Sequence, residues 1–537
     1  MKKYFARDYN IVENTDITVG FRAILDDLRA ESGEKELIFD KGTYYLTSKN
    51  STKLHLNITN TIGINEWEKG EEINEHFVPI YIDDINNLTI DFSNSTLIIK
   101  GVVTNIVITN STNIKLENVE IQTDNPNLHE LKVIDKKPFY TDYELDNESK
   151  YEKIGSKYYF VGEDYRLPFK YKTTKTWWIC DIKPNTPNKT KRTFHPLLST
   201  KLKEIAPYKF RAYGLNSAKF EIGERLYLYD VRRKDVGIFV DNSKNITLQN
   251  IAQRFNYSLA IVCQHTENIT IDSVDFTPVG AKRIVSIADF IQICMCSGDV
   301  VVRNSRFEGA GDDCLNVHGF HFKIVDINND KITVRFMHPQ SYGFMPFDVG
   351  DELAYIDRTS LIKKGTAKVL GCKMLNEYEI EITVDNVPDI SLMVENITKT
   401  PNLLFENNYL NRIITRGILV TTKGKVVIRN NIFNDNSMSG ILLSDDANMW
   451  YESGCCNDVL IEGNTFNNSE EYDILIKPEN TKFEGYVHNN ITIQNNEFNS
   501  KIGGGIFVKD SGNVVIKNNK INEKTFNIIN KNSNIIE

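Results

Sequence analysis

The sequence predicts an all-β fold: a right-handed parallel β-helix with two inserted small β-barrel-like domains and an N-terminal capping helix. Fragments with a short alternating apolar strand, an often asparagine-rich corner and a further apolar residue, such as NITLQNI and NITIDSVDF, recur along the chain. Their equivalent positions are repeatedly 23 residues apart, with occasional steps of 31 to 33, and such a period indicates a solenoid whose coils carry loop insertions. The pairs that define the short step are Leu248 and Ile271, Phe405 and Ile428, and Ile493 and Ile516.

The recurring asparagine is expected at a corner of each coil. Asparagine tolerates the left-handed backbone conformation, and stacked side-chain amides can bond one another along the axis of a solenoid. We therefore give this column a structural role; its members are Asn118, Asn250, Asn304, Asn407, Asn430, Asn495 and Asn518.

Two stretches interrupt the repeat and divide the chain into five parts. Residues 130–235 and 320–400 are rich in strand-like segments without the asparagine corner, and each is long enough to form a small β domain. The repeat occupies residues 1–129, 236–319 and 401–537. Near the N-terminus, apolar residues at helical spacing predict a helix that covers the open end of the solenoid; they are Val19, Phe21, Ile24, Leu25 and Leu28.

Composition excludes several classes of protein. A net charge of -9 argues against a nucleic-acid partner, and no apolar run is long enough to span a membrane. No signal peptide follows the first lysines, so we expect a cytoplasmic protein, or a secreted or periplasmic one if a leader was removed. The eight cysteines lack the spacing of a zinc site and are expected as buried free thiols. The sequence indicates no cofactor or metal and leaves the oligomeric state open.

The strongest candidate for chemistry is a cluster of acids at Asp289, Asp312 and Asp313. The 23-residue separation of Asp289 and Asp312 places them on neighbouring coils, and Gly309 and Gly311 supply a bend that lets both adjacent acids face outward. Crowded carboxylates raise one another's pKa, so one holds a proton, as glycosidic cleavage requires. A calcium site and a purely structural cluster are the alternatives.

Several motifs together resemble glycoside hydrolase family 110. These are Ala288-Asp289-Phe290 and GDDCLNVHG (311–319), with FDKGTYYL (39–46), IVCQHTENITI (261–271), HPQSYGFMPFDVGD (338–351) and SDDANMWYESG (444–454). The resemblance covers most of the chain. It implies an exo-acting α-galactosidase that removes terminal α-1,3-linked galactose with inversion, from linear Gal-α-1,3-Gal, blood-group B type glycans or both.

The resemblance also implies roles for individual residues. Asp312 would be the general acid, and Asp289 with Asp313 would hold and deprotonate the attacking water. The substrate, a galactose-terminated oligosaccharide or glycoconjugate, would be bound by residues on the acids' loop and on other coils: Arg283, Asn316, His318, Gln264, Arg416, Trp450 and Glu452.

Two other interpretations compete with this one. Gly311-Asp312-Asp313-Cys314 is also similar to a segment of polygalacturonases, but their upstream N-T-D motif is replaced by Ala288-Asp289 and their downstream R-I-K segment is absent. A non-catalytic carbohydrate-binding β-helix is the second. Inversion rests on the resemblance alone, because coils about 4.8 Å apart suggest a carboxylate gap nearer the retaining value.

Overall fold

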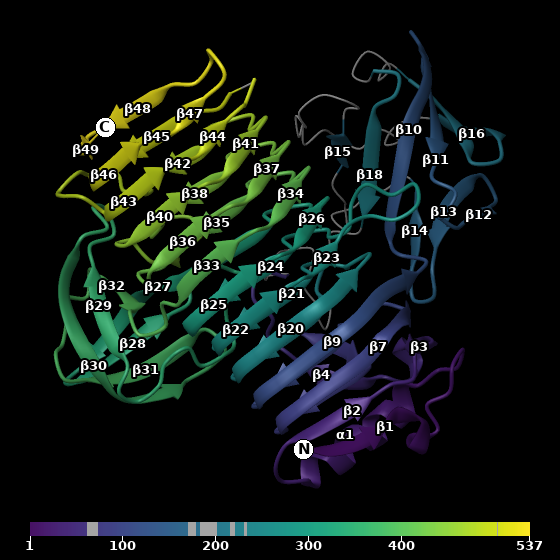
Figure 1. The fold of residues 1–537 in the computed structure, drawn as a ribbon, viewed down its shortest axis with the longest axis horizontal. Coiled ribbons are helices and arrows are strands. Elements are labelled where there is room, and N and C mark those ends of the chain that lie inside the picture. The colour runs from purple at the N-terminus through teal and green to yellow at the C-terminus, as the bar shows by residue number, and fades with distance from the viewer. Residues whose placement is uncertain are drawn as a thin grey trace.

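The computed structural model confirms a right-handed parallel β-helix (Figure 1) and describes residues 1–61, 74–169, 179–182, 201–214, 221–229, 233–501 and 503–536. Two long parallel sheets run along the helix axis. The main strands of the first sheet are β7 (Asn86–Lys100), β9 (Thr112–Asp124), β20 (Lys244–Gln253), β22 (Glu267–Asp272), β25 (Ser297–Arg303), β33 (Asn402–Glu406), β36 (Val426–Arg429), β40 (Val459–Glu462), β43 (His488–Gln494) and β46 (Ser511–Lys517). The second sheet contains β6 (Ile80–Asp83), β8 (Ile106–Thr109), β19 (Ile238–Asp241), β21 (Ile261–Gln264), β24 (Ile291–Cys294), β27 (Leu315–Asn328), β35 (Ile418–Val420), β38 (Ile441–Leu443), β42 (Ile474–Ile476), β45 (Ile506–Lys509) and β48 (Ile528–Lys531).

Strand pairing in the first sheet follows the predicted period. Leu248 pairs with Ile271, Phe405 with Ile428, and Ile493 with Ile516. These side chains are buried and stack inside the coils with their neighbours, because equivalent positions of parallel strands lie about 4.8 Å apart. The register of the first sheet is therefore readable from the sequence.

The predicted asparagine column has the expected left-handed backbone, with φ between 51° and 61° at all seven positions. Its amides stack where coils are adjacent: Asn250 Nδ2 donates to Asn118 Oδ1 at 2.8 Å. A second column, one residue later, lies inside the corner. There Asn431 Nδ2 donates to Asn464 Oδ1 at 2.9 Å, and Asn464 Nδ2 donates to Asn496 Oδ1 at 3.0 Å. The sequence pattern did not distinguish the exposed column from the buried one.

Replacing Asn464 with alanine is expected to lower the free energy of unfolding by about 2–3 kcal/mol, because the buried main-chain N–H of Asn431 and carbonyl of Ile428 lose their side-chain partner. Denaturant unfolding measures the change. Asn499→Ala is the control, because Asn499 stacks on Asn467 in a half-buried ladder that water reaches, and it should cost well under half as much. Equal losses in the two variants would contradict a special role for the buried column.

The N-terminal end of the β-helix is covered by helix α1 (Thr18–Ala30), as predicted. Phe21, Ile24, Leu25 and Leu28 are buried, and Phe21 packs against aromatic rings of the first coils. Val19 was wrongly assigned to this apolar face. It is 57 % exposed, because it lies on the side of the helix that turns away from the coils.

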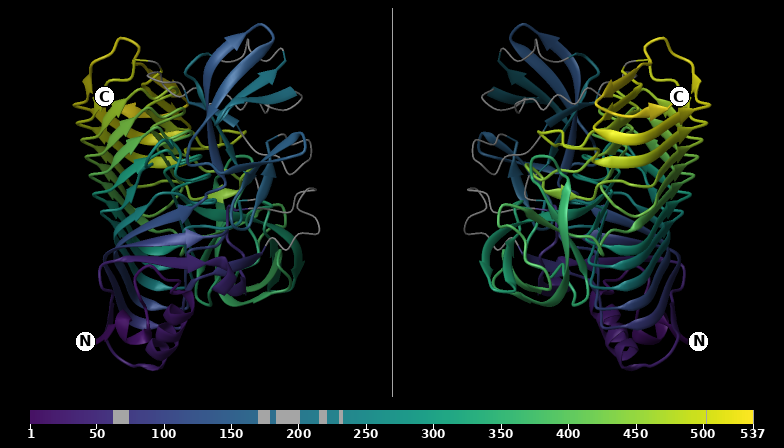
Figure 2. Two further views of the ribbon diagram at one scale, coloured as in Figure 1. Left: turned by 90° about the vertical axis from the view of Figure 1, so that its right-hand side faces the viewer. Right: turned by 90° about the vertical axis from the view of Figure 1, so that its left-hand side faces the viewer.

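Two groups of antiparallel strands project from the same side of the β-helix (Figure 2). The first contains a six-stranded sheet, β15 (Ile179–Ile182), β18 (Arg225–Tyr229), β10 (Leu128–Lys137), β11 (Tyr140–Leu145), β17 (Lys209–Tyr213) and β16 (Lys201–Ala206), and a three-stranded sheet, β12 (Tyr151–Ile154), β13 (Lys157–Val161) and β14 (Arg166–Pro168). The two sheets share one hydrophobic core that includes Val133, Phe160 and Phe210.

The second group is a closed antiparallel barrel. Strand β27 leaves the second sheet and continues into it, pairing with β28 (Lys331–Arg335) and β32 (Met393–Asn396). The ring is completed by β31 (Glu379–Val384), β30 (Lys363–Met374) and β29 (Glu352–Ile356). Because β27 starts beside the predicted acids, the barrel is rigidly joined to the candidate site.

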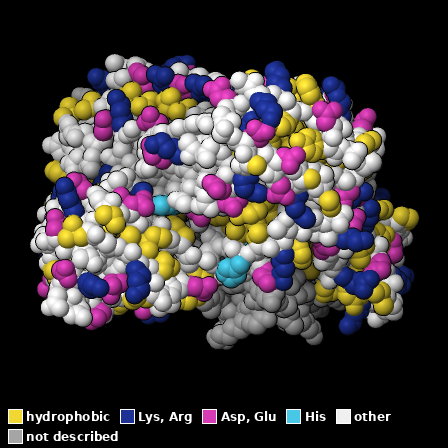
Figure 3. All heavy atoms as spheres, turned by 90° about the horizontal axis from the view of Figure 1, so that it is seen from below, with side chains coloured by type: hydrophobic (Ala, Val, Ile, Leu, Met, Phe, Trp, Pro, Cys, Tyr) yellow, Lys and Arg dark blue, Asp and Glu magenta, His cyan; other side chains and the backbone are white. Residues whose placement is uncertain are grey.

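Three further findings concern the molecule as a whole. The face in Figure 3 carries acidic and basic side chains interspersed, without a patch of one sign. No helix among the residues described above is long and apolar enough to cross a bilayer. Seven cysteines are free thiols, of which Cys372 and Cys455 are only partly buried, and the side chain of Cys180 lies outside the described residues.

Candidate active site

The three predicted acids lie together just before neighbouring strands of the second sheet. Strand β24 pairs with β27 at an offset of 24 residues, so Asp289 stands beside Asp313. Backbone bonds hold this register: Phe290 N donates to Asp313 O at 3.0 Å, and Ile291 N donates to Cys314 O at 3.0 Å. The neighbour of Asp289 is thus Asp313, one residue beyond the Asp312 that the 23-residue spacing predicts.

Asp312 and Asp313 are adjacent in sequence but differ in environment. The Asp312 side chain is 33 % exposed, whereas that of Asp313 is 2 % exposed. The Gly309 bend has φ +81°, and a Cβ at Gly311 would lie 2.3 Å from the Ile287 carbonyl oxygen, so glycine is needed for the close approach of the two coils. One acid of the pair therefore faces solvent while the other lies in the protein.

Arg416, on the next coil, holds Asp313 in place. Its Nε and Nη2 lie 2.8 Å from Asp313 Oδ1 and Oδ2 respectively, a paired contact that fixes the carboxylate plane. Arg416 Nη2 is also 3.8 Å from Asp312 Oδ1. Thr415 Oγ1 lies between the acids, 2.5 Å from Asp313 Oδ1 and 3.1 Å from Asp312 Oδ1.

Asp289 is buried to about the same extent as Asp313. Its side chain accepts a bond from Asn60 Nδ2 at 3.2 Å. Burial, followed by the charges of Asp312 and Asp313, raises the pKa of Asp289 well above its usual range, and Arg233 and Arg416 only partly oppose this. Burial also raises the pKa of Asp313, with Arg416 opposing it. Asp289 and Asp313 therefore retain a proton more readily than isolated aspartates do.

Three of the predicted binding residues gather on one side of the acids. Asn316 Nδ2 donates to Glu452 Oε1 at 3.0 Å, and His318 Nε2 lies 3.8 Å from the same oxygen. Gln292 Nε2 donates to His318 Nε2 at 2.9 Å, while His318 Nδ1 donates to the Gly319 carbonyl at 3.0 Å. Asn316 Oδ1 is buried without a partner among the described residues, so it is an acceptor available to a ligand hydroxyl.

Trp450 is half exposed and stacks on His338, with ring centroids 4.7 Å apart. Burial, with the nearby charges of His318 and Arg233, lowers the pKa of His338 to about 4, which keeps this ring neutral. His321 holds the loop that carries Trp450 and Glu452. Its Nε2 pairs with Asp445 Oδ1 at 2.7 Å, and its backbone N donates to Tyr451 O. A neutral aromatic pair thus borders the acids on the barrel side.

Gln264 and Arg283 lie farther from the chemistry. Gln264 is buried and bonds Thr59 N and Asn57 O, so it supports the segment 57–61 that brings Asn60 to Asp289. The side chain of Arg283 forms no hydrogen bond or ion pair with the three acids; its backbone instead packs against Gly309 and bonds Glu130. The charge of Arg233 acts on Asp289.

Sequence analysis missed several residues of this site, namely Asn60, Arg233, Gln292, His338 and Thr415. His338 lies in HPQSYGF, one of the segments that carry the family resemblance, and Thr415 directly precedes Arg416, a predicted binding residue. Asn60 and Arg233 lie in segments with no repeat pattern. Only the folded chain brings these two to Asp289.

The arrangement suits acid–base chemistry at an exposed carboxyl. Arg416 lies among two buried acids and one accessible acid, and its guanidinium contacts Asp312 and Asp313. The guanidinium therefore occupies the position that a bound cation would need. Within the described ranges, no group of three or more His, Cys, Asp or Glu residues is arranged to hold a metal ion.

Comparisons with known proteins agree on one family. A family model described as GLAA-B beta-barrel domain II matches residues 331–394, within the closed barrel. "Alpha-1,3-galactosidase A" of Bacteroides thetaiotaomicron is 33 % identical over 470 residues, covering 86 % of this chain and 81 % of that protein. This chain belongs to the α-1,3-galactosidase family. The resemblance to glycoside hydrolase family 110 is thereby confirmed.

Other relatives carry the same name. "Alpha-1,3-galactosidase A" of Bacteroides fragilis is 31 % identical over 517 residues, covering 93 % of this chain and 84 % of that protein. "Alpha-1,3-galactosidase B" of Phocaeicola vulgatus is 27 % identical, covering 93 % of this chain and 88 % of that protein. Membership of the α-1,3-galactosidase family favours an α-galactosidase over a polygalacturonase or a non-catalytic β-helix.

Proposed function

We propose that the protein is an exo-acting α-galactosidase that hydrolyses terminal α-1,3-linked galactose from galactose-terminated oligosaccharides or glycoconjugates. The observation that carries the proposal is the set of Asp289, Asp312 and Asp313 around Arg416, in a chain of this family. A glycosidase needs one protonated and one ionised carboxyl on either side of the scissile bond. The raised pKa values of Asp289 and Asp313 favour retention of a proton within this set of acids.

The environments of the acids distinguish their roles. Asp312 is the general acid, because it is the most exposed member of the set and so the most accessible to a leaving-group oxygen. Asp289 and Asp313 hold the attacking water and remove its proton. Arg416 keeps Asp313 oriented for this, since both of its contacts are at 2.8 Å.

Asn316, His318 and Glu452 bind galactose hydroxyls in this proposal. Asn316 offers an unpartnered acceptor, and Glu452 is 15 % exposed and already oriented by Asn316. Trp450 covers the apolar face of the sugar, supported from behind by His338. Attack by water from the side opposite the leaving group gives inversion of the anomeric carbon.

A panel of galactosyl disaccharides tests the proposed linkage. We expect release of galactose from Gal-α-1,3-Gal and at least a hundredfold lower kcat/KM, about 3 kcal/mol in the transition state, for the α-1,4 and α-1,6 isomers. A fucosylated blood-group B oligosaccharide assayed in parallel shows whether branched substrates are accepted. Equal rates on the three linkages would contradict the α-1,3 assignment.

Replacing Arg416 with methionine is expected to shift the acidic limb of the kcat/KM–pH profile to higher pH. Arg416 opposes the rise in pKa at both Asp289 and Asp313, so without it these two proposed bases keep their protons to higher pH. Arg429→Met is the control, because Arg429 pairs with Glu406 in the first sheet. A downward shift of the limb, or the same shift in the control, would rule out this electrostatic role.

A further inference from the structure

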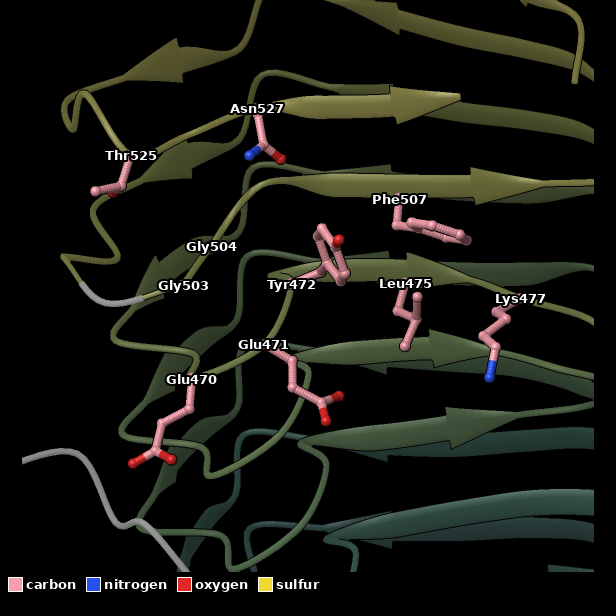
Figure 4. Close-up of a pocket in the computed structure, with 10 residues that line it drawn as sticks. All are labelled: Glu470, Glu471, Tyr472, Leu475, Lys477, Gly503, Gly504, Phe507, Thr525 and Asn527. Carbon is pink, nitrogen blue, oxygen red and sulfur yellow. The ribbon is translucent and has the colours of Figure 1, made fainter. Parts of the chain in front are cut away.

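A pocket of about 610 Å³ opens at later coils of the second sheet. It is lined by Glu470, Glu471, Tyr472, Leu475, Lys477, Gly503, Gly504, Phe507, Thr525 and Asn527 (Figure 4). Tyr472 and Phe507 lie with ring centroids 5.4 Å apart, and both are partly exposed. The pocket therefore combines aromatic surface with charged and amide side chains, the composition of a site for a polar ligand that has apolar faces.

Strand register connects this pocket to the candidate active site. Asn316 pairs with Leu419, Leu419 with Leu442, Leu442 with Leu475, and Leu475 with Phe507. These positions point outward, since the flanking residues of each strand are in the core. Outward positions of a solvated sheet are ordinarily polar. Here the positions that follow Asn316 are apolar: Leu419 is buried, Leu442 is partly exposed, and the partly exposed Leu475 and Phe507 line the pocket.

The same register relates the acids to the pocket. Extended to the residues just before these strands, it places Arg416, Ser439 and Tyr472 at the position equivalent to Asp313 on the next three coils. Three coils correspond to about 14 Å along the axis. The charge of Arg416 also acts on Glu471, whose side chain is directed toward the earlier coils (Figure 4).

One side of the acid site is covered. On the N-terminal side, the segment 57–61 lies over Asp289 through Asn60 and is held by Gln264. Glu452 contacts Asn316, and Trp450, which is half exposed, stacks on His338. A substrate with its terminal galactose at Asp312 can extend away from the segment 57–61, toward the later coils.

We infer that this pocket is a second binding site for the same substrate, taking sugar rings of the aglycone beyond the cleaved bond. The inference rests on the proposed function. Tyr472 and Phe507 stack on apolar ring faces, and Glu471, Lys477 and Asn527 bond hydroxyls or amide groups. The enzyme accordingly prefers oligosaccharides of several rings to a disaccharide.

The test compares Gal-α-1,3-Gal with a linear tetrasaccharide that ends in the same disaccharide. In Phe507→Ala and Tyr472→Ala, KM for the tetrasaccharide should rise about five- to tenfold, while its kcat and both constants for the disaccharide change less than about twofold. Phe483→Ala is the matched control, because Phe483 is an aromatic of the later coils outside the pocket. Equal changes for both substrates, or none for the tetrasaccharide, would overturn the inference.

A binding measurement separates this inference from the proposed function. Calorimetric titration of the trisaccharide product, which lacks the terminal galactose, should give a Kd that is about five- to tenfold weaker in Phe507→Ala than in the natural chain. Binding without hydrolysis of either substrate would refute the proposed function and keep the pocket. Hydrolysis with an unchanged product Kd in Phe507→Ala would refute the pocket and keep the function.

Discussion

Replacing Asp312 with asparagine is expected to reduce kcat on Gal-α-1,3-Gal by about 10²–10⁴-fold, because the leaving oxygen loses its proton donor. KM should change little, since the side chain keeps its shape and its contact with Thr415. Steady-state kinetics with galactose release as the readout gives both constants. The free energy of unfolding should change by no more than about 0.5 kcal/mol, because the Asp312 side chain is partly exposed.

Asp299→Asn is the matched control for Asp312. Asp299 lies on the first sheet, between Asp289 and Asp312 in sequence, and it is exposed. It accepts a hydrogen bond from Asn402, which an asparagine at this position can also accept. Its kcat should stay within about twofold of the natural chain. Near-normal turnover in Asp312→Asn would remove Asp312 as the general acid and transfer that role to another member of the set.

Replacing Asp289 with asparagine should abolish most activity and also stabilise the fold. In the folded state the pKa of Asp289 is raised, chiefly by burial, so the ionised group opposes folding wherever pH exceeds its unfolded-state pKa. The amide removes this opposition and still accepts the bond from Asn60. We expect the free energy of unfolding to rise by about 1–2 kcal/mol at neutral pH.

The pH dependence checks the sign of this effect. Below the unfolded-state pKa of aspartate, about pH 4, both states are protonated and the gain should vanish; it should grow as pH rises toward the folded-state pKa. Denaturant unfolding at several pH values measures this trend. A gain that is constant with pH would mean that packing, not charge burial, accounts for the difference.

Asp272 offers a contrast of opposite sign. It is also buried, but bonds from Asn304, Arg303 and Ser273 outweigh the burial and lower its pKa. Asp272→Asn should therefore destabilise the protein above the unfolded-state pKa of aspartate. Destabilisation of both variants by a similar amount would contradict the account of the acid set.

The repeat made the β-helix predictable because each coil uses the same short sequence pattern to form the same strand and corner. Strand alternation and the left-handed asparagine are written into each fragment, as Asn118 and Asn250 illustrate, so register followed from spacing alone. The barrel at β27–β32 and the first inserted group have no such period. The sequence predicts strands in both regions. Which sheet each strand joins depends on pairing between segments that are distant in sequence, and no local pattern encodes that pairing.

The acids were predictable for the same reason, and their surroundings were not. Asp289 and Asp313 are neighbours because coils stack, which spacing reveals to within one residue. Asn60 and Arg233 reach Asp289 from segments far away in sequence, through loops whose course no local pattern encodes. The role of Arg283 in binding the sugar, which the family resemblance implies, stays a prediction.

Proton NMR of Gal-α-1,3-Gal during hydrolysis by the full chain tests the central claim most directly. The account predicts that galactose is released only with the acid set intact and that the β anomer appears first, before mutarotation produces the α anomer. Initial α-galactose would contradict attack by water held at Asp289 and Asp313. No release of galactose at all would contradict the proposed α-1,3-galactosidase itself.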